Sequence, residues 1–135
     1  MRNAKVELMD VVLKGCTQYA LWITESTSET TVVVATRCEF ANSDTGVLVH
    51  RGSLTSAKFN NCVFHHNTQR GIYGHQSTIH LHGEATAIHS NRSGIAAFMT
   101  CKVIIHLPSN HNTSYNNTGE DRSTFNGGTI TNVED

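Results

Sequence analysis

The sequence predicts an all-β fold, a single-stranded parallel β-helix or solenoid of about five rungs of about 25 residues each. The chain repeats itself in segments that line up on Ala20, Gly46, Gly71, Gly94 and Gly119, and a repeat of this length indicates stacked units. Apolar residues alternate after each of these anchors, which is typical of strands. Helix formers are sparse and no apolar stripe of helical period persists, so a helical solenoid is disfavoured.

Each repeat is expected to hold three short strands, whose inward residues stack on those of the next rung about 4.8 Å away. The first strand has the inward pairs Val6/Leu8, Val32/Val34, Ala57/Phe59, Ile79/Leu81 and Val103/Ile105. The second has Val11/Leu13, Cys38/Phe40, Cys62/Phe64 and Thr86/Ile88. The third follows the anchor and has Leu21/Ile23, Val47/Val49, Ile72/Gly74 and Ile95/Ala97.

A polar bend with an asparagine precedes each of the three central glycines. These asparagines are Asn42, Asn67 and Asn91. Asparagine and glycine both tolerate the left-handed backbone that sharp corners require. We therefore expect the asparagines to shape equivalent corners and the glycines to stand in one vertical column.

The length of 135 residues suits one domain, residues 1–135, with rungs over roughly 5–119. Residues 106–135 form a polar C-terminal segment, for which a cap on the coil is one open role. We expect a final strand from Thr129 to Val133 within it. Glu120, Asp121 and Arg122 are interpreted as solvated charges at a bend.

Charge and hydropathy limit the partners of the chain. The formal net charge is −1 and the basic residues are scattered, so no nucleic-acid partner is expected. No apolar run approaches the roughly 20 residues of a membrane span, so no membrane is expected either. The four cysteines include no CxxC pair, and Cys38 and Cys62 are expected inward, as buried thiols rather than a disulfide.

An asparagine three or four places before Gly-Ile or Gly-Val, followed by alternating apolar residues, resembles the repeats of the pectin-lyase-like superfamily. The similarity is greatest to its repeats of the carbohydrate-binding and sugar-hydrolase type, and it covers roughly Lys5 to Gly119. The resemblance implies a right-handed coil. It implies no one activity, because the superfamily includes lyases, hydrolases, epimerases, phage tailspikes and noncatalytic modules.

No catalytic residues are predicted. Enzymes of this superfamily carry clustered aspartates, and glycoside hydrolysis needs two carboxylates at a defined separation. The aspartates of this chain, Asp10, Asp44, Asp121 and Asp135, fall in different rungs. The sequence therefore favours a noncatalytic binding or assembly module. A carbohydrate-active enzyme, of the polysaccharide lyase, hydrolase or epimerase kind, or a fragment of one, stays open as the alternative.

The histidines fall in register as three vertical pairs: His50 beneath His75, His65 beneath His89, and His82 beneath His106. We interpret them as outward side-chain ladders. A two-histidine metal site would need a further carboxylate or thiolate, and none is in register. No metal site and no cofactor are predicted.

If Leu21, Val47, Ile72 and Ile95 point inward, one outward column is Trp22, Leu48, Tyr73 and Ala96, and the next is Thr24, His50, His75 and Phe98. The candidate binding residues are Trp22, Leu48, His50, Tyr73, His75 and Phe98. A polysaccharide or other glycan could stack on the aromatic rings. Another protein chain, including a second copy in a homo-oligomer, could dock on them. Coverage by the C-terminal tail of the same chain also stays open.

Overall fold

Equivalent strands of successive repeats lie side by side and parallel in the computed structural model, which describes residues 2–24, 29–50, 55–107 and 113–134. Sheet A holds β1 (Arg2–Met9), β4 (Glu29–Thr36), β7 (Thr55–Asn60), β10 (Thr78–His82), β13 (Lys102–Leu107) and β16 (Thr129–Glu134). Sheet B holds β2 (Val12–Lys14), β5 (Glu39–Ala41), β8 (Val63–His65), β11 (Ala87–His89) and β14 (Ser114–Tyr115). Sheet C holds β3 (Tyr19–Ile23), β6 (Thr45–His50), β9 (Arg70–His75), β12 (Ser93–Phe98) and β15 (Glu120–Phe125).

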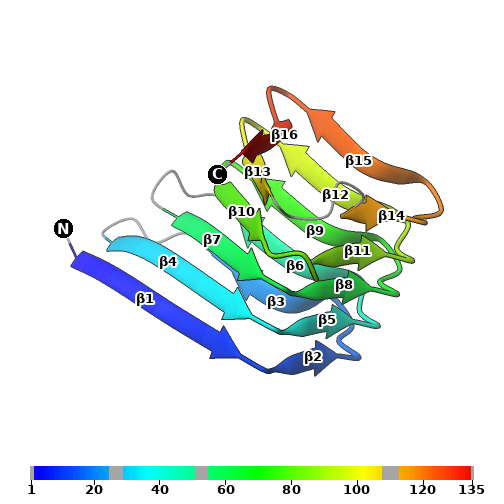
Figure 1. The fold of residues 1–135 in the computed structure, drawn as a ribbon, viewed down its shortest axis with the longest axis horizontal. Helices are drawn as coiled ribbons and strands as arrows, with labels where there is room; N and C mark the ends of the chain where they lie inside the picture. The colour runs from blue at the N-terminus through cyan, green and yellow to red at the C-terminus, as the bar shows by residue number, and fades with distance from the viewer. Residues whose placement is uncertain (1, 25–28, 51–54, 108–112, 135) are drawn as a thin grey trace.

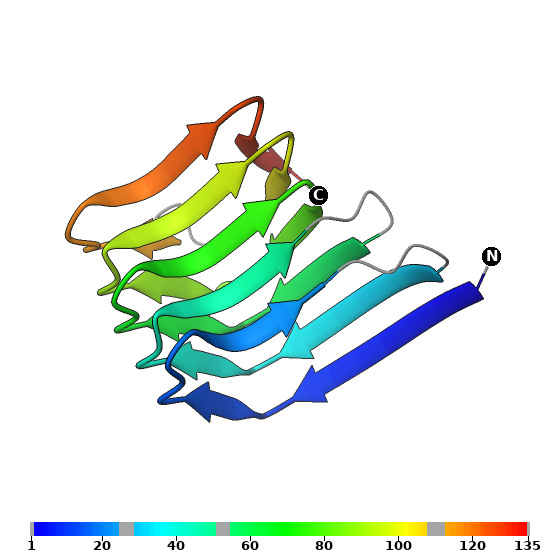
Figure 2. The same ribbon diagram turned by 180° about the vertical axis from the view of Figure 1, so that it is seen from behind.

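The neighbours of each strand within a sheet come from the rungs before and after it, and the pairing is parallel throughout. Figure 1 shows the three strands of each rung following one another around the coil, and Figure 2 shows the strands of sheet C stacked from β3 to β15. This arrangement confirms the all-β parallel β-helix that the repeats predict.

The core lies between the three sheets and is built from stacked columns of apolar residues. Phe40 lies over Phe64, with ring centroids 5.1 Å apart, and Phe59 meets both rings edge-on. All three phenylalanines are fully buried. Ile72 and Ile95, stacked in sheet C, are fully buried as well. The inward residues expected in the second and third strands of each repeat are therefore confirmed.

The first strand of the second repeat has the opposite phase to the one predicted. Val33 and Ala35 are buried and stack on Ala57 and Phe59, so the inward pair Val32/Val34 is wrong by one residue. The run Thr-Thr-Val-Val-Val-Ala-Thr is apolar or β-branched on both faces, so it carries no alternation from which the phase can be read. The other four pairs hold the predicted register, although Val6 in the first rung is 47% exposed.

A ladder of buried asparagines ties the corner between sheets B and C from rung to rung. The Asn91 side-chain amide donates to the carbonyl of Phe64 at 3.1 Å and to Oδ1 of Asn117 at 3.0 Å. Its own Oδ1 accepts from the backbone N–H and the side-chain amide of Asn67, at 3.0 and 2.9 Å. Each asparagine thus satisfies backbone groups that the corner leaves without a strand partner.

The left-handed corner residue is the one just before this ladder. Asn42, His66, Ser90 and Asn116 have φ between 51° and 57°. Asn42 therefore belongs to the left-handed column, and its predicted equivalence with Asn67 and Asn91 is wrong by one residue. Ser43 holds the ladder position, since its N–H donates to Oδ1 of Asn67 at 3.2 Å. The sequence could not separate the two roles because asparagine suits both.

Gly46, Gly71 and Gly94 stand in one vertical column, as predicted. They are required there by the close approach of neighbouring rungs and not by a left-handed backbone, because a Cβ on Gly71 would lie 2.7 Å from Ile88 and 2.9 Å from the Gly94 carbonyl oxygen. Gly119 does not continue the column. Ile95 pairs with Arg122, so Asp121 takes the equivalent place in the fifth rung, two residues further along the chain.

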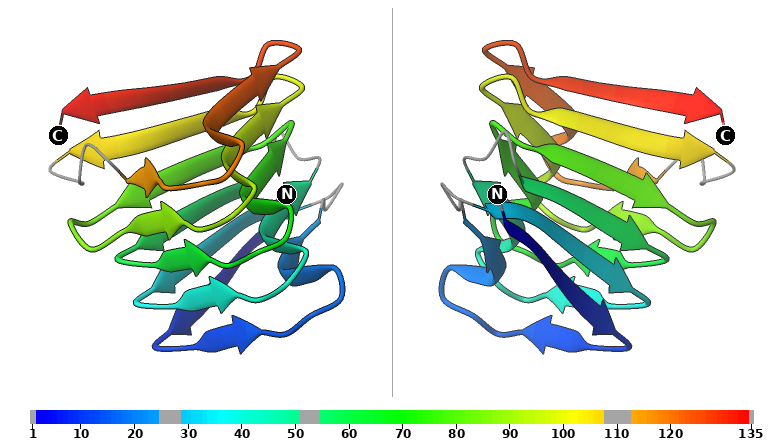
Figure 3. Two further views of the ribbon diagram at one scale, coloured as in Figure 1. Left: turned by 90° about the vertical axis from the view of Figure 1, so that its right-hand side faces the viewer. Right: turned by 90° about the vertical axis from the view of Figure 1, so that its left-hand side faces the viewer.

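The C-terminal segment extends the coil where it is described. β16 confirms the predicted final strand and pairs with β13 in sheet A, so it does not lie across sheet C (Figure 3). Glu120, Asp121 and Arg122 are exposed, as expected, but they belong to β15 and not to a bend. The sequence did not predict this strand because its residues are mostly polar, and in the structure all of them except Ser123 are exposed.

Replacing Asn91 by alanine should destabilise the fold by about 2–4 kcal/mol, because the change removes two donated bonds and leaves groups on Asn67 without their acceptor. Asn42→Ala is the matched control. It removes an exposed asparagine from the same corner and should cost about 1 kcal/mol through the left-handed backbone alone. Urea denaturation of both variants measures the difference, and equal losses would contradict the ladder's role.

The buried thiols should be unreactive in the folded protein. Cys38 and Cys62 are buried and free, as predicted, and burial raises the pKa of Cys62 from 9.0 to about 11. Burial likewise raises the pKa of Cys101. Because the thiolate is the reactive form, a thiol reagent near neutral pH should modify Cys62 and Cys101 only when the chain unfolds. Mass spectrometry of labelled Cys16→Ser protein tests this, and rapid native labelling of Cys62 would contradict it.

Candidate binding face on sheet C

The register of sheet C brings the predicted binding residues together. Trp22, Leu48, Tyr73, Ala96 and Ser123 form one outward column in that order. His50, His75, Phe98 and Phe125 form the neighbouring column. The two columns are two residues apart along each strand, so they lie on the same face.

The members of this face are unequally accessible. Trp22 is 58% exposed, and Tyr73, His50, His75 and Phe98 are partly exposed. Leu48 is only 5% exposed, so its expected display needs correction. It stands in register between the larger residues Trp22 and Tyr73, one strand spacing from each. Leu48 is therefore a buried member of this column and not an exposed binding residue.

Arg70 joins the aromatic residues at the centre of the face. Its guanidinium carbon lies 4.4 Å from the ring centroid of Tyr73 and 5.7 Å from that of Phe98, while the two rings pack edge to face at 5.2 Å. Phe125 continues the row with a centroid 5.5 Å from that of Phe98. The sequence analysis missed Arg70, because strict alternation places a residue three positions before Tyr73 on the opposite face of the strand, so periodicity carried no signal for this contact.

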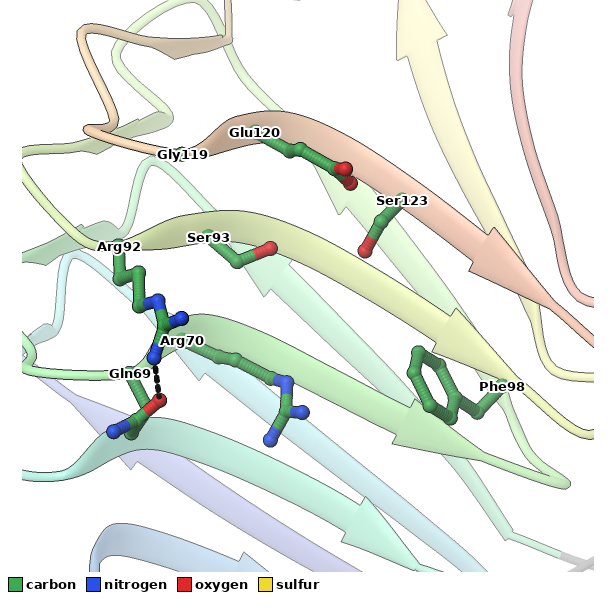
Figure 4. Close-up of a pocket in the computed structure, with 8 residues that line it drawn as sticks. All are labelled: Gln69, Arg70, Arg92, Ser93, Phe98, Gly119, Glu120 and Ser123. Atoms are coloured by element: carbon green, nitrogen blue, oxygen red, sulfur yellow. Dashed lines mark hydrogen bonds between the residues drawn. The ribbon is translucent and has the colours of Figure 1, made fainter.

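A hollow of about 370 Å³ opens beside this cluster. We call it the sheet C hollow. It is lined by Gln69, Arg70, Arg92, Ser93, Phe98, Gly119, Glu120 and Ser123. Figure 4 shows the Phe98 ring at one end and Arg92 with Gln69 at the other, joined by a 3.4 Å hydrogen bond from the arginine. The hollow draws on three rungs, because Arg70, Ser93 and Glu120 are register partners in β9, β12 and β15.

The chemistry of the hollow is that of a polar binding site with one aromatic wall. For a ligand, the guanidinium groups of Arg70 and Arg92 offer donors, the carboxylate of Glu120 offers acceptors, and the hydroxyls of Ser93 and Ser123 offer both. Glu120 is the one carboxylate among the lining residues, whereas hydrolysis of a glycosidic bond by paired carboxylates needs two.

The histidines stack in the three vertical pairs that the sequence predicts. The ring centroids of His50 and His75 lie 4.9 Å apart on sheet C. His65 and His89 lie 5.3 Å apart on sheet B, and His82 and His106 lie 4.0 Å apart on sheet A.

A carboxylate reaches the pair on sheet B from outside the register, a contact that the register alone does not predict. Glu39 lies two positions before Ala41, the register partner of His65, yet its Oε1 is in hydrogen-bond contact with Nε2 of His65. His66 joins the pair, since its Nδ1 lies 2.6 Å from Nδ1 of His65. Burial lowers the pKa of His89, and the nearby His65 and His66 lower it further.

A third histidine completes the group on sheet A. Nδ1 of His80 lies 2.8 Å from Nε2 of His106, and ligand atoms of His80, His82 and His106 lie within 4.8 Å of one another. Burial lowers the pKa of His80, and His106, His82 and Lys58 lower it further. The sequence analysis missed His80, for which the signal was His-x-His on one strand, since alternate residues share a face.

Parallel rungs around a stacked core, with outward ladders of equivalent side chains, define a β-solenoid. The family model described as a right-handed β-helix region matches residues 1–134, so the chain belongs to that family. The right-handed coil is thereby shown, and the resemblance to the pectin-lyase-like superfamily is consistent with it. Comparison with curated proteins and with solved structures finds no match. The described residues include no apolar helix of membrane-spanning length.

Acid should destabilise the protein in part through His89. Its pKa is lowered in the folded chain, so the unfolded chain binds the proton more tightly and stability present above about pH 6.5 is lost as the pH falls through the folded pKa. His89→Gln should lose less stability than the unaltered protein between about pH 7.5 and 5. Urea midpoints across this range measure the effect, and identical curves would exclude His89 as a contributor.

Proposed function

We propose that this β-helix is a noncatalytic binding module that holds a glycan on sheet C. The observation that carries the proposal is that the sheet C hollow is lined by the Phe98 ring and by Arg70, which contacts both the Phe98 ring and the neighbouring Tyr73 ring. A sugar presents hydroxyls around its rim and apolar C–H groups on its ring faces. Polar groups and an aromatic wall on one face match those two kinds of surface.

The size and lining of the hollow support a glycan over a docked protein chain. A volume of about 370 Å³ lies at the lower end of ligand pockets, which run from about 300 to 1,000 Å³, and suits a short saccharide segment. Its lining includes Glu120, Ser93 and Ser123, residue types in which protein interfaces are depleted. Two arginines against one glutamate favour a sugar with an acidic group.

Glycan binding should depend on Tyr73. We expect Tyr73→Ala to weaken binding of the best ligand, found in a panel of acidic and neutral oligosaccharides, by about tenfold, equivalent to about 1.4 kcal/mol. Arg70→Gln should weaken acidic ligands more than neutral ones, because it removes a positive charge and keeps a polar side chain. Tyr115→Ala, which removes a tyrosine from sheet B, is the matched control and should bind normally. Isothermal titration calorimetry measures all three.

Three outcomes would replace the proposal. Binding that survives both Tyr73→Ala and Arg70→Gln would place the glycan elsewhere. A mass that rises with protein concentration, and that Tyr73→Ala returns to the monomer, would make the face an assembly surface. Cleavage or epimerisation of any polysaccharide in the panel, lost in Glu120→Gln, would favour the enzymatic alternative.

A further inference from the structure

We propose that His80, His82 and His106 form a binding site for a divalent transition metal ion of the zinc class on the outward face of sheet A. The site lies on a different sheet from the proposed glycan face and does not rest on it. It is carried by the one group of three or more ligand-type side chains that converges within the described residues.

The fold itself brings the three imidazoles together. His80 and His82 are alternate residues of β10, so both project from one face of the sheet. His106 follows in β13, where Leu81 pairs with Ile105 and the next position places His106 beside His82. Two of the ligands therefore come from one strand and the third comes from the neighbouring strand of the next rung. Because all three stand on paired strands, the sheet holds their backbone positions fixed.

The ligand atoms lie within 4.8 Å of one another, near the separations that zinc requires. Zinc lies 2.0–2.1 Å from histidine nitrogens in tetrahedral sites, which places two such nitrogens about 3.3 Å apart. Nδ1 of His80 and Nε2 of His106 are 2.8 Å apart, so this pair has to open by about half an ångström. The three rings are stacked with interplanar angles between 11° and 26°, so they also have to turn to aim their nitrogens at one ion. Rotation about the last side-chain torsion of a histidine is soft and allows this without moving the backbone.

The donor set selects the class of metal. Imidazole nitrogens suit zinc, copper and nickel, whereas calcium and magnesium take oxygen ligands. Three protein ligands leave the fourth tetrahedral position for water, as in the open type of zinc site. All three histidines are partly exposed, so an ion can enter and leave without unfolding the sheet.

Lys58 provides a further test, because it is the register partner of His80 in the rung below. A positive charge there repels a bound cation and reduces the affinity of the site. Lys58→Gln should therefore strengthen binding by about twofold, the scale of a partly screened surface charge. Zinc held loosely by scattered histidines would show no such gain.

The experiment is a titration of the purified, metal-stripped chain with Zn²⁺ by calorimetry, repeated with Co²⁺, whose visible absorption reports tetrahedral coordination. We expect one ion per chain, and affinity about tenfold weaker or worse in each of His80→Gln, His82→Gln and His106→Gln. His50→Gln, which removes one ring from the stack on sheet C, is the matched control and should bind normally. Thermal unfolding without metal verifies that each variant is folded, and with metal it should show a higher midpoint only where the site is intact.

The proposal is overturned if the three sheet A variants bind as the unaltered chain does, or if His50→Gln weakens binding equally. Octahedral Co²⁺ absorption with several ions per chain would also overturn it, since that pattern belongs to dispersed surface histidines. Because His80, His82, His106 and Lys58 all lie on sheet A, failure of the metal site leaves glycan binding on sheet C unchanged, and the reverse also holds.

Discussion

The structure depends on the fixed register between one rung and the next. Parallel backbone hydrogen bonds set the spacing, and the asparagine ladder of Asn67, Asn91 and the partly exposed Asn117 fixes the corner at which the chain turns from sheet B into sheet C. A slip of one residue would turn the apolar columns outward and break every ladder bond at once. The corner therefore selects the register that the core also requires, and agreement between these two levels is what specifies one fold.

Register converts a distance along the sequence into contact in space. Residues near 25 positions apart become neighbours, so a side chain that recurs in a repeat becomes a ladder on the surface. Arg70 reaches two aromatic rings, one on its own strand and one on the next rung, and Ser93 and Glu120 stand beyond it. The same rule stacks the imidazoles. Both candidate sites are consequences of the repeat, which explains why neither carries a local sequence motif.

The repeat and the alternation were enough to predict the fold, the core columns and the three histidine pairs, because stacking makes period and phase the main variables. Prediction failed where the sequence carries no phase, as in the valine run of β4, and where one residue type serves two roles, as at Asn42 and Asn67. It also failed for contacts between columns. Glu39 meets His65 and His80 meets His106 across the register, and such diagonal contacts depend on side-chain length and rotamer, which periodicity does not encode.

The buried core keeps the two candidate sites separate. Sheet A and sheet C share no surface residues in the groups described, and between them lie fully buried columns such as Phe59, Phe64 and Ile72. Interiors packed this densely do not deform continuously, so a ligand on one sheet alters the other only if a second packing arrangement exists. In a solenoid with one rigid core and three chemically different faces, residues on one face can therefore be substituted while the stacked core and the other two faces keep their structure.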